Sequence, residues 1–328
     1  MDKGIGLMEP VEKICREFIQ GRISRASLIG DGRINDTFCV KAGEESFICQ
    51  RIQRKMDTDI LEHNYLLYSA ALDRVKLAYP KWLRDRDGRF FYTDSKGDRW
   101  RMYPMIGGTV LQVPLPEETL FACGRALAGI HAALQGMSEK PKAVFPMLHD
   151  LKYYYEKFLW VLEHDLSGEE RDPELEKYFA SGIEEFRNLQ TDRTAVIHGD
   201  PKLANILFSE GNVKAFIDLD TVMPGALIED VADCIRSCCV RKGKLDTGAQ
   251  QIFLQGYQSG DNGLLTGKDL KCLPQVIRKI RFELGLRYYT DAIAEEKSFK
   301  EKYPGYLMGK ARENCLYAIF TCEGTGKW

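Results

Sequence analysis

Two short polar motifs, HGDPKLAN at residues 198–205 and IDLD at residues 217–220, decide how this sequence is interpreted. Between them lie the apolar runs ILF and VKAF, which are separated by the turn SEGN at residues 209–212. Apolar runs of this length around a turn that contains glycine predict a β-hairpin. Such a hairpin would bring both polar motifs to the same end of its two strands.

The expected register of this hairpin places two oxygen-bearing side chains close together. If the turn pairs Phe208 with Val213, then Asn205 pairs with Phe216. Side chains alternate faces along a strand, so Asp218 becomes the diagonal neighbour of Asn205, about 7 to 8 Å away. Two such side chains can hold one hard cation, which predicts a Mg²⁺ site formed by Asn205 and Asp218.

The first motif also contains the groups that phosphoryl transfer from ATP requires. In that reaction Mg²⁺ offsets the charge of the phosphates, and a separate carboxylate orients the attacking hydroxyl and accepts its proton. Asp200 is the predicted carboxylate, and Lys202 is predicted to place its charge on the γ-phosphate. The alternative is that these polar residues only cap turns, but their combined spacing between apolar strands favours catalysis.

The composition is that of an ordinary globular protein, and nothing in it indicates a nucleic-acid or membrane partner. The chain has 328 residues, enough for two lobes, and its 46 Lys and Arg nearly balance 48 Asp and Glu. No apolar stretch approaches the ~18 residues of a membrane span, and the start shows no secretory signal, so we expect a cytoplasmic protein. The ten cysteines include no CxxC pair and are expected to be buried hydrophobic residues.

Strand, turn and helix signals along the chain predict an α+β fold with two lobes. Residues 1–104 contain two predicted hairpins, TFCV-KAGEE-SFICQRI and RFFYT-DSKGD-RWRMY, with a helix between them that Asp59 would cap. Residues 105–328 are mainly helical apart from the hairpin described above. We therefore expect a small sheet-rich N-terminal lobe, a larger helical C-terminal lobe and a hinge at about residues 103–110.

The motifs resemble the catalytic and metal-binding segments of the aminoglycoside phosphotransferase and choline kinase superfamily, whose members share the protein-kinase fold. GDGRINDTF resembles the nucleotide loop, RMYPMIGGT the hinge and RALAGIHAAL the helix that supports the active site. Within the superfamily, DPKLANIL and IDLDTVMPGAL are similar to bacterial N-acetylhexosamine 1-kinases, which phosphorylate the anomeric hydroxyl of N-acetylglucosamine and N-acetylgalactosamine. The resemblance implies ATP and Mg²⁺ as cofactors and a small sugar as substrate, and it leaves the oligomeric state open.

The resemblance also implies where ATP binds. Glycines let a backbone fold closely over phosphates, although a simple turn between two strands would also explain a pair of glycines. The backbone around residues 103–106 would hold the adenine. The expected nucleotide-binding residues are Gly30, Gly32, Asn35, Thr37, Gln50, Tyr103, Met105 and Ile106.

One position departs from the kinase pattern. Where kinases carry a phosphate-binding lysine, the expected register places Gln50, whose amide brings no charge. Charge neutralisation would then fall on Mg²⁺, Lys202 or Arg51, and Glu62 is the only acidic helix residue that could stand for the usual partner of that lysine. A pseudokinase that binds ATP without turnover is the alternative, which the intact catalytic and metal motifs disfavour.

A distal helix supplies the candidate acceptor site. Glu283, Arg287 and Asp291 recur every four residues and therefore line one helix face. This face is either an exposed ladder of ion pairs or, as the resemblance implies, the place from which Arg287 reaches sugar hydroxyls or an acetamide. Arg33 and Asp220 are further candidates for acceptor contact, with a second Mg²⁺ as the other role for Asp220.

Three residues are expected to support catalysis rather than perform it. His131 is expected to be a packed histidine, His198 to anchor the catalytic loop by hydrogen bonds, and Asp230 to brace that loop. The sequence thus predicts an ATP-dependent small-molecule kinase that is most similar to a sugar 1-kinase. Aminoglycoside, choline and homoserine kinases remain alternatives, although residues 278–302 are rich in Lys and Arg, unlike a site for a cationic acceptor.

Overall fold

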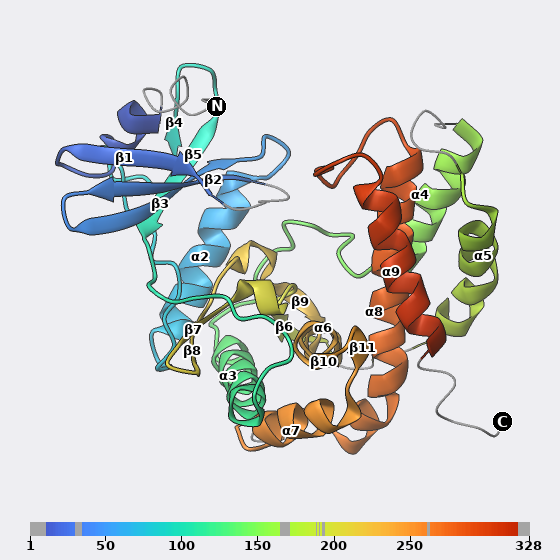
Figure 1. Cartoon of the computed structure of the whole chain (residues 1–328). Helices are drawn as coiled ribbons and strands as arrows, with labels where there is room; N and C mark the ends of the chain where they lie inside the picture. Colours follow the sequence, from blue (N-terminus) through green and yellow to red (C-terminus); the bar gives the residue numbers. More distant parts are fainter. Residues whose placement is uncertain are drawn as a thin grey trace.

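The computed structural model describes residues 11–29, 35–164, 171–187, 189, 191, 194–260 and 263–320. Its N-terminal part is a five-stranded antiparallel sheet in the order β1-β2-β3-β5-β4, with helix α2 beside it (Figure 1). The elements are β1 (Ile23–Leu28), β2 (Asp36–Ala42), β3 (Glu45–Ile52), α2 (Thr58–Leu72), β4 (Tyr92–Thr93) and β5 (Arg99–Pro104). Both predicted N-terminal hairpins are present, and β1 is a strand that the sequence analysis did not predict.

The sheet has an apolar core on the side that faces the helical turn at residues 11–15. Alternation along the strands sends Phe38, Val40, Phe47 and Cys49 into this core, together with Trp100. The opposite alternation places Thr37 and Gln50 on the other face, where the functional residues gather. The sheet therefore separates its own core from the candidate site.

Helix α2 has its N-cap two residues earlier than predicted. Its N-cap is Asp57, whose carboxylate accepts hydrogen bonds from the backbone N–H groups of Asp59 and Ile60. The prediction of Asp59 as the cap was wrong, because a capping side chain must precede the amides that it satisfies by two or three residues. Asp59 instead lies in the first turn, where its charge favours the helix dipole.

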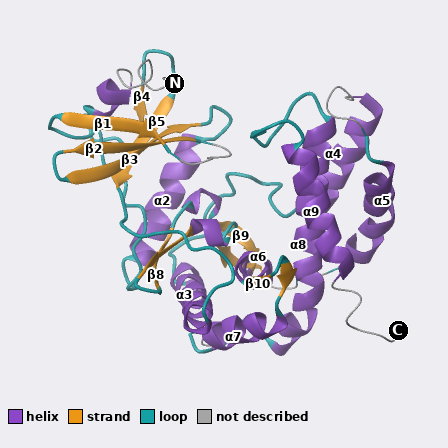
Figure 2. Ribbon diagram, in the orientation of Figure 1, coloured by secondary structure: helices purple, strands orange, loops and turns teal. Residues whose placement is uncertain are grey.

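The C-terminal part is mainly helical, as expected (Figure 2). Two short antiparallel pairs, β6 with β9 and β7 with β8, interrupt the helices, and Figure 1 shows β7 and β8 beside α2 and α3. None of the described helices combines the length and the apolar character that a membrane span needs. The bounds are α3 (Glu117–Gln135), α4 (Leu151–His164), α5 (Pro173–Arg187), β6 (Thr194–Ile197), β7 (Ile206–Ser209), β8 (Asn212–Phe216), β9 (Met223–Ala226), α6 (Leu227–Cys238), β10 (Val240–Arg241), β11 (Lys244–Leu245), α7 (Thr247–Gln258), α8 (Gly267–Ile293) and α9 (Tyr306–Phe320).

Two large cores hold the helical part together. One core joins α2 to α3, α6 and α7, so the helix of the N-terminal part packs into the body of the C-terminal part. The other core lies in the bundle of α4, α5, α8 and α9, and Phe158, Phe179 and Tyr289 are among its fully buried aromatic residues. Figure 1 shows this bundle at the side of the molecule opposite the sheet. The candidate site lies where the sheet meets the helical part.

The β7–β8 hairpin differs from its predicted register. Phe208 does pair with Val213, but a bulge at Lys214 pairs Phe216 with Ile206 rather than with Asn205. An extra residue in one strand shifts every pair beyond it by one position. The carbonyl of Lys214, the bulged residue, accepts the backbone N–H of Ala78 at 2.9 Å.

Candidate active site

The loop that carries Asp200 is held by one buried carboxylate. Asp230 on α6 accepts the backbone N–H groups of His198 at 2.6 Å and of Gly199 at 2.9 Å. Gly199 adopts φ +86°, and a Cβ there would lie 2.4 Å from the carbonyl oxygen of Thr221. The predicted bracing role of Asp230 is therefore confirmed, and the glycine at residue 199 is required by both its conformation and its surroundings.

The catalytic loop brings two predicted residues, Lys202 and Asn205, into contact with Asp200. The Lys202 ammonium forms an ion pair with Asp200, and the Asn205 amide donates to the Asp200 carbonyl at 2.9 Å and to its carboxylate at 3.2 Å. Asp200 and Lys202 are partly exposed, whereas Asn205 is buried in a short 3₁₀ turn. The Asp200 carboxylate is thus oriented by two neighbours and remains accessible to a substrate.

Asp218 lies next to this group, although not for the predicted reason. The Asn205 carbonyl accepts the N–H of Ile217 at 2.9 Å, and Asp218 follows it with φ 63° and ψ 54°, a left-handed conformation that Asp tolerates. The backbone of Asn205 is thus paired with Ile217, and Asp218 follows Ile217 directly instead of lying diagonally across the hairpin. Asn205 and Asp218 stay the predicted ligands of a cation.

The donor atoms at this turn fit a hard divalent cation. Among the described residues the Asp218 side chain has no hydrogen bond or ion pair, although solvent reaches it. Burial in the surrounding protein, followed by the charges of Asp220 and Asp200, raises the pKa of Asp218 to about 6. A bound Mg²⁺ would relieve this repulsion, with Asp218 and the amide oxygen of Asn205 as its protein ligands. The described residues contain no cluster of three or more His, Cys, Asp and Glu side chains suited to a metal, so phosphate oxygens or water would complete such a site.

Asp220 makes an interaction that the sequence analysis missed. Both of its oxygens accept hydrogen bonds from Arg101 on β5, at 2.6 and 2.7 Å, and Asn35 donates to it at 3.4 Å. Arg101 also donates from Nε to Gln50, whose amide donates in turn to Thr37. Arg101 and Gln50 occupy the same rung of the β3–β5 ladder. Only this pairing of distant strands could have revealed Arg101.

The remaining predicted nucleotide residues are placed unequally. Asn35, Thr37 and Gln50 join the network just described, whereas Gly30, Gly32 and Arg33 lie outside the described residues. Arg51 points to the opposite face of its strand, where it pairs with Asp36 and Asp98. The suggestion that Arg51 replaces the missing lysine is therefore wrong. Glu62 forms no hydrogen bond or ion pair with a described residue.

The predicted hinge has one free amide among the three expected residues. The Met105 N–H donates to the carbonyl of Ser46 at 2.8 Å, which continues the pairing of β5 with β3. Tyr103 is half-buried, and Met105 is exposed. The Ile106 N–H has no hydrogen bond to a described residue, so it is the backbone donor of this segment that remains available to an adenine ring.

The candidate acceptor side is built from α8 and the loop before α4. Glu283 and Asp291 are both 2% exposed, so the interpretation of this helix face as an exposed ion-pair ladder is wrong. Arg287 pairs with Glu283 at 3.4 Å, and its guanidinium lies over the rings of Tyr154 and Phe299. His149, which the sequence analysis missed, lies 3.8 Å from Glu283.

Two histidines have the supporting roles that were expected. His131 is buried between the Asp230 carboxylate and the Tyr257 hydroxyl, at 2.9 and 2.7 Å. Burial lowers the pKa of His198, and its Nδ1 accepts the backbone N–H of Asp200 at 3.3 Å. A third histidine, His149, donates from Nε2 to the carbonyl of Gly199 at 3.0 Å and so links the acceptor side to the catalytic loop.

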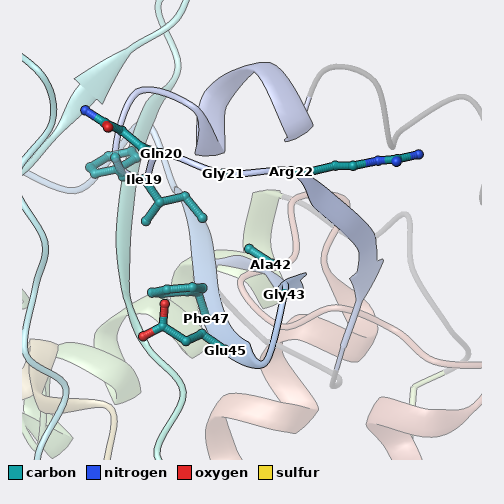
Figure 3. Close-up of a pocket in the computed structure, with 9 residues that line it drawn as sticks. Ile19, Gln20, Gly21, Arg22, Ala42, Gly43, Glu45 and Phe47 are labelled. Carbon is teal, nitrogen blue, oxygen red and sulfur yellow. The ribbon is translucent and has the colours of Figure 1, made fainter.

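A hollow of about 520 Å³ lies elsewhere on the molecule. Figure 3 shows it beside Gly21 at the start of β1 and the β2–β3 turn, with Arg22 and Glu45 as its charged lining residues. These residues lie at the opposite end of the β2–β3 ladder from the paired residues Thr37 and Gln50. The hollow brings together no carboxylate and amide set like that around Asp200, so we do not assign the chemistry to it.

The described elements form the two-lobed, protein-kinase-like fold. A family model described as the Phosphotransferase enzyme family, APH, matches residues 25–263, and the chain belongs to this family. The expected superfamily and the two-lobed α+β fold are thereby confirmed.

Solved structures similar to this chain show the same fold. A microcompartment-associated aminopropanol kinase is 18% identical with a TM-score of 0.67, covering 96% of this chain and 98% of that one. A choline kinase from Cryptosporidium parvum is 13% identical with a TM-score of 0.67, covering 96% and 95%. The amicoumacin kinase hAmiN, in complex with AMP-PNP, Ca²⁺ and Ami, is 12% identical with a TM-score of 0.65, covering 95% and 93%.

Proposed function

We propose that the protein is an ATP-dependent kinase that phosphorylates a hydroxyl of a small neutral sugar, with the anomeric hydroxyl of an N-acetylhexosamine as the favoured acceptor. The observation that carries the phosphotransferase assignment is the grouping of Asp200, Lys202 and Asn205 in one loop that pairs with the segment leading to Asp218, whose carboxylate bonds to no described residue. ATP would lie between the sheet and the catalytic loop, with the Ile106 amide available to its adenine.

The residues have distinct roles in the proposed reaction. Bound Mg²⁺ would offset the charge of the phosphates, and Asn205 and Asp218 would hold it. Asp200 orients the acceptor hydroxyl and accepts its proton, and Lys202 stabilises the charge on the transferred phosphoryl group. An anomeric hydroxyl is more acidic than an ordinary alcohol, so a weak base such as the Asp200 carboxylate can accept its proton more readily.

Charge on the acceptor side supports a neutral acceptor. Four buried carboxylates of α6 and α8 each have a Lys or Arg of this chain within 4 Å. The pairs are Glu229 with Lys279, Asp233 with Arg236, Glu283 with Arg287 and Asp291 with Lys157. A site for a polycation would instead leave such carboxylates unneutralised. Arg287 between two aromatic rings suits hydroxyl and carbonyl oxygens together with the apolar face of a sugar ring.

The test is ADP release with Mg²⁺-ATP over a panel of acceptors. The panel holds N-acetylglucosamine, N-acetylgalactosamine, galactose and glucosamine, together with choline, homoserine and kanamycin. Turnover confined to free reducing sugars, lost in the methyl glycosides and in Asp200→Asn, would support the sugar 1-kinase. Turnover only with an alcohol that bears an amine would overturn the sugar assignment and keep the phosphotransferase. Nucleotide binding without any turnover would indicate a pseudokinase.

A further inference from the structure

Arg101 and Asp220 form a buried ion pair between the sheet and the turn that carries Asp218. The two side chains are 4% and 5% exposed, and the guanidinium engages both carboxylate oxygens. The ring of Trp82 lies 4.6 Å from the guanidinium carbon, and Gln50 accepts the remaining Nε–H. The two residues are 119 positions apart in the sequence.

Folding stability does not by itself explain a pair in this place. Moving both charges out of water costs much of what their attraction returns, and apolar pairs of similar size are often at least as stable. The removal of one partner is a different matter, because it leaves the other charge buried and unpaired. Arg101 therefore acts mainly by pairing with the buried carboxylate of Asp220.

The location of Asp220 makes its charge consequential. It is two residues from Asp218, and each of its oxygens accepts a hydrogen bond from Arg101. A second uncompensated carboxylate at this turn would also face the polyphosphate of ATP. Gln50, which shares a ladder rung with Arg101, has no charge to offer.

We infer that Arg101 is a positioning residue that neutralises Asp220, so that Asp218, which pairs with no described residue, is the carboxylate presented to Mg²⁺-ATP at this turn. In this arrangement the sheet contributes a cation from β5, Arg101, instead of a lysine from β3. Arg101 acts on the site by pairing with Asp220. The inference rests on the proposed function only in naming Mg²⁺-ATP as the ligand.

Calorimetric titration with Mg²⁺-ATP, without an acceptor, tests this inference. Arg101→Gln leaves Asp220 unpaired and is expected to weaken the Kd on the order of 100-fold. Arg101→Lys keeps the charge and is expected to stay within about tenfold of wild type. Arg54→Gln removes an exposed arginine of the same lobe that pairs with Asp98, and it is the matched control with an unchanged Kd.

Two double variants separate neutralisation of Asp220 from a purely structural role. Arg101→Gln combined with Asp220→Asn removes both charges and is expected to restore the Kd to within about tenfold of wild type. Gln50→Lys combined with Arg101→Gln returns a cation to the same rung and is expected to recover binding in the same way. A neutral pair that binds as weakly as Arg101→Gln, or Arg101→Gln that binds like wild type, would overturn the inference.

Thermal melts accompany each titration. If Arg101→Gln shows no cooperative transition, the neutral pair carries the test, since it has no unpaired buried charge, and its failure to bind Mg²⁺-ATP would overturn the inference. The acceptor panel is independent of this result. A wild-type protein that binds Mg²⁺-ATP but phosphorylates no acceptor would contradict the proposed function and leave the role of Arg101 measurable.

Discussion

The carboxylate of Asp230 lies 2.9 Å from Nε2 of His131, and solvent reaches neither side chain. The same carboxylate holds the two amides that precede Asp200, so α3, α6 and the catalytic loop meet at one buried group. Burial alone would raise the pKa of Asp230, but the hydrogen bond and charge of His131 and the amides lower it below its ordinary value. A charged Asp230 is therefore part of the folded state.

Asp230→Asn is expected to reduce the free energy of unfolding by about 2 to 4 kcal/mol, because the amide NH₂ of Asn would face one of the two backbone N–H donors in a dry site. Urea denaturation at neutral pH measures the loss. Asp269→Asn, at the exposed capping box of α8, is the matched control and should lose about 1 kcal/mol or less. Equal losses in the two variants would contradict the bracing role.

Gly199→Ala is expected to abolish activity and to destabilise the protein by more than about 2 kcal/mol, because the new Cβ would meet the Thr221 carbonyl at 2.4 Å. Gly88→Ala isolates the effect of conformation, since Gly88 has φ +83° and open space around it. That control should lose only about 1 kcal/mol and retain activity. Thermal melts and ADP release measure both variants, and matching losses would refute the packing argument.

Asp218→Asn is expected to lower kcat by on the order of 100-fold or more while the protein stays folded. Asn tolerates the left-handed conformation of this position, so the change removes charge without adding backbone strain. ADP release over a range of MgCl₂ concentrations provides the measurement, and the variant should need more Mg²⁺ than wild type. Asp94→Asn, in the distant β4–β5 turn, is the control. An unchanged Mg²⁺ requirement would exclude Asp218 as a metal ligand.

His149 is expected to make stability depend on pH. Burial lowers the pKa of His149, but the charges of Glu283, Glu229 and Asp233 outweigh burial and raise it above its ordinary value. A raised pKa stabilises the folded state fully below the unfolded pKa near 6.5, and this contribution is lost as the pH rises through the folded pKa.

The advantage of wild type over His149→Asn should therefore shrink as the pH rises above 6.5. Asn suits the backbone of this position, which has φ 64°. Urea denaturation at a series of pH values from below 6 to above 8 measures the difference, with His164→Asn at the exposed end of α4 as the control. A difference that grows with pH would contradict the sign of the shift.

Arg287→Met is expected to raise the KM for the acceptor by at least about tenfold and to leave Mg²⁺-ATP binding unchanged, because the guanidinium lies on the acceptor side over Tyr154. Arg278→Met provides the control on the same helix, where the arginine pairs with Glu185. Steady-state kinetics with each substrate varied in turn separates the two constants. A change confined to the KM for ATP would remove Arg287 from the acceptor site.

Local sequence signals were sufficient for the catalytic loop and for most helices and hairpins. Asp200, Lys202 and Asn205 lie within six residues, and a loop between apolar strands leaves few ways to arrange them. The helix start at Asp57 and the register of β8 were missed for local reasons of a different kind. Asp57 and Asp59 are two residues apart and either could cap a helix. The residues of β8 do not show where its bulge falls.

The sequence by itself determined that a carboxylate, a lysine and an amide would meet in one loop, because short chain segments have few conformations and these residues are neighbours in the chain. Only the tertiary structure decided which charges accompany them. Arg101 reaches Asp220 because β5 pairs with β3 and the sheet lies against the turn after β8. His149 reaches Gly199 from a loop 50 residues away. Such contacts depend on how helices, strands and loops pack together. A contact between two residues far apart in the chain leaves no periodic pattern in the sequence.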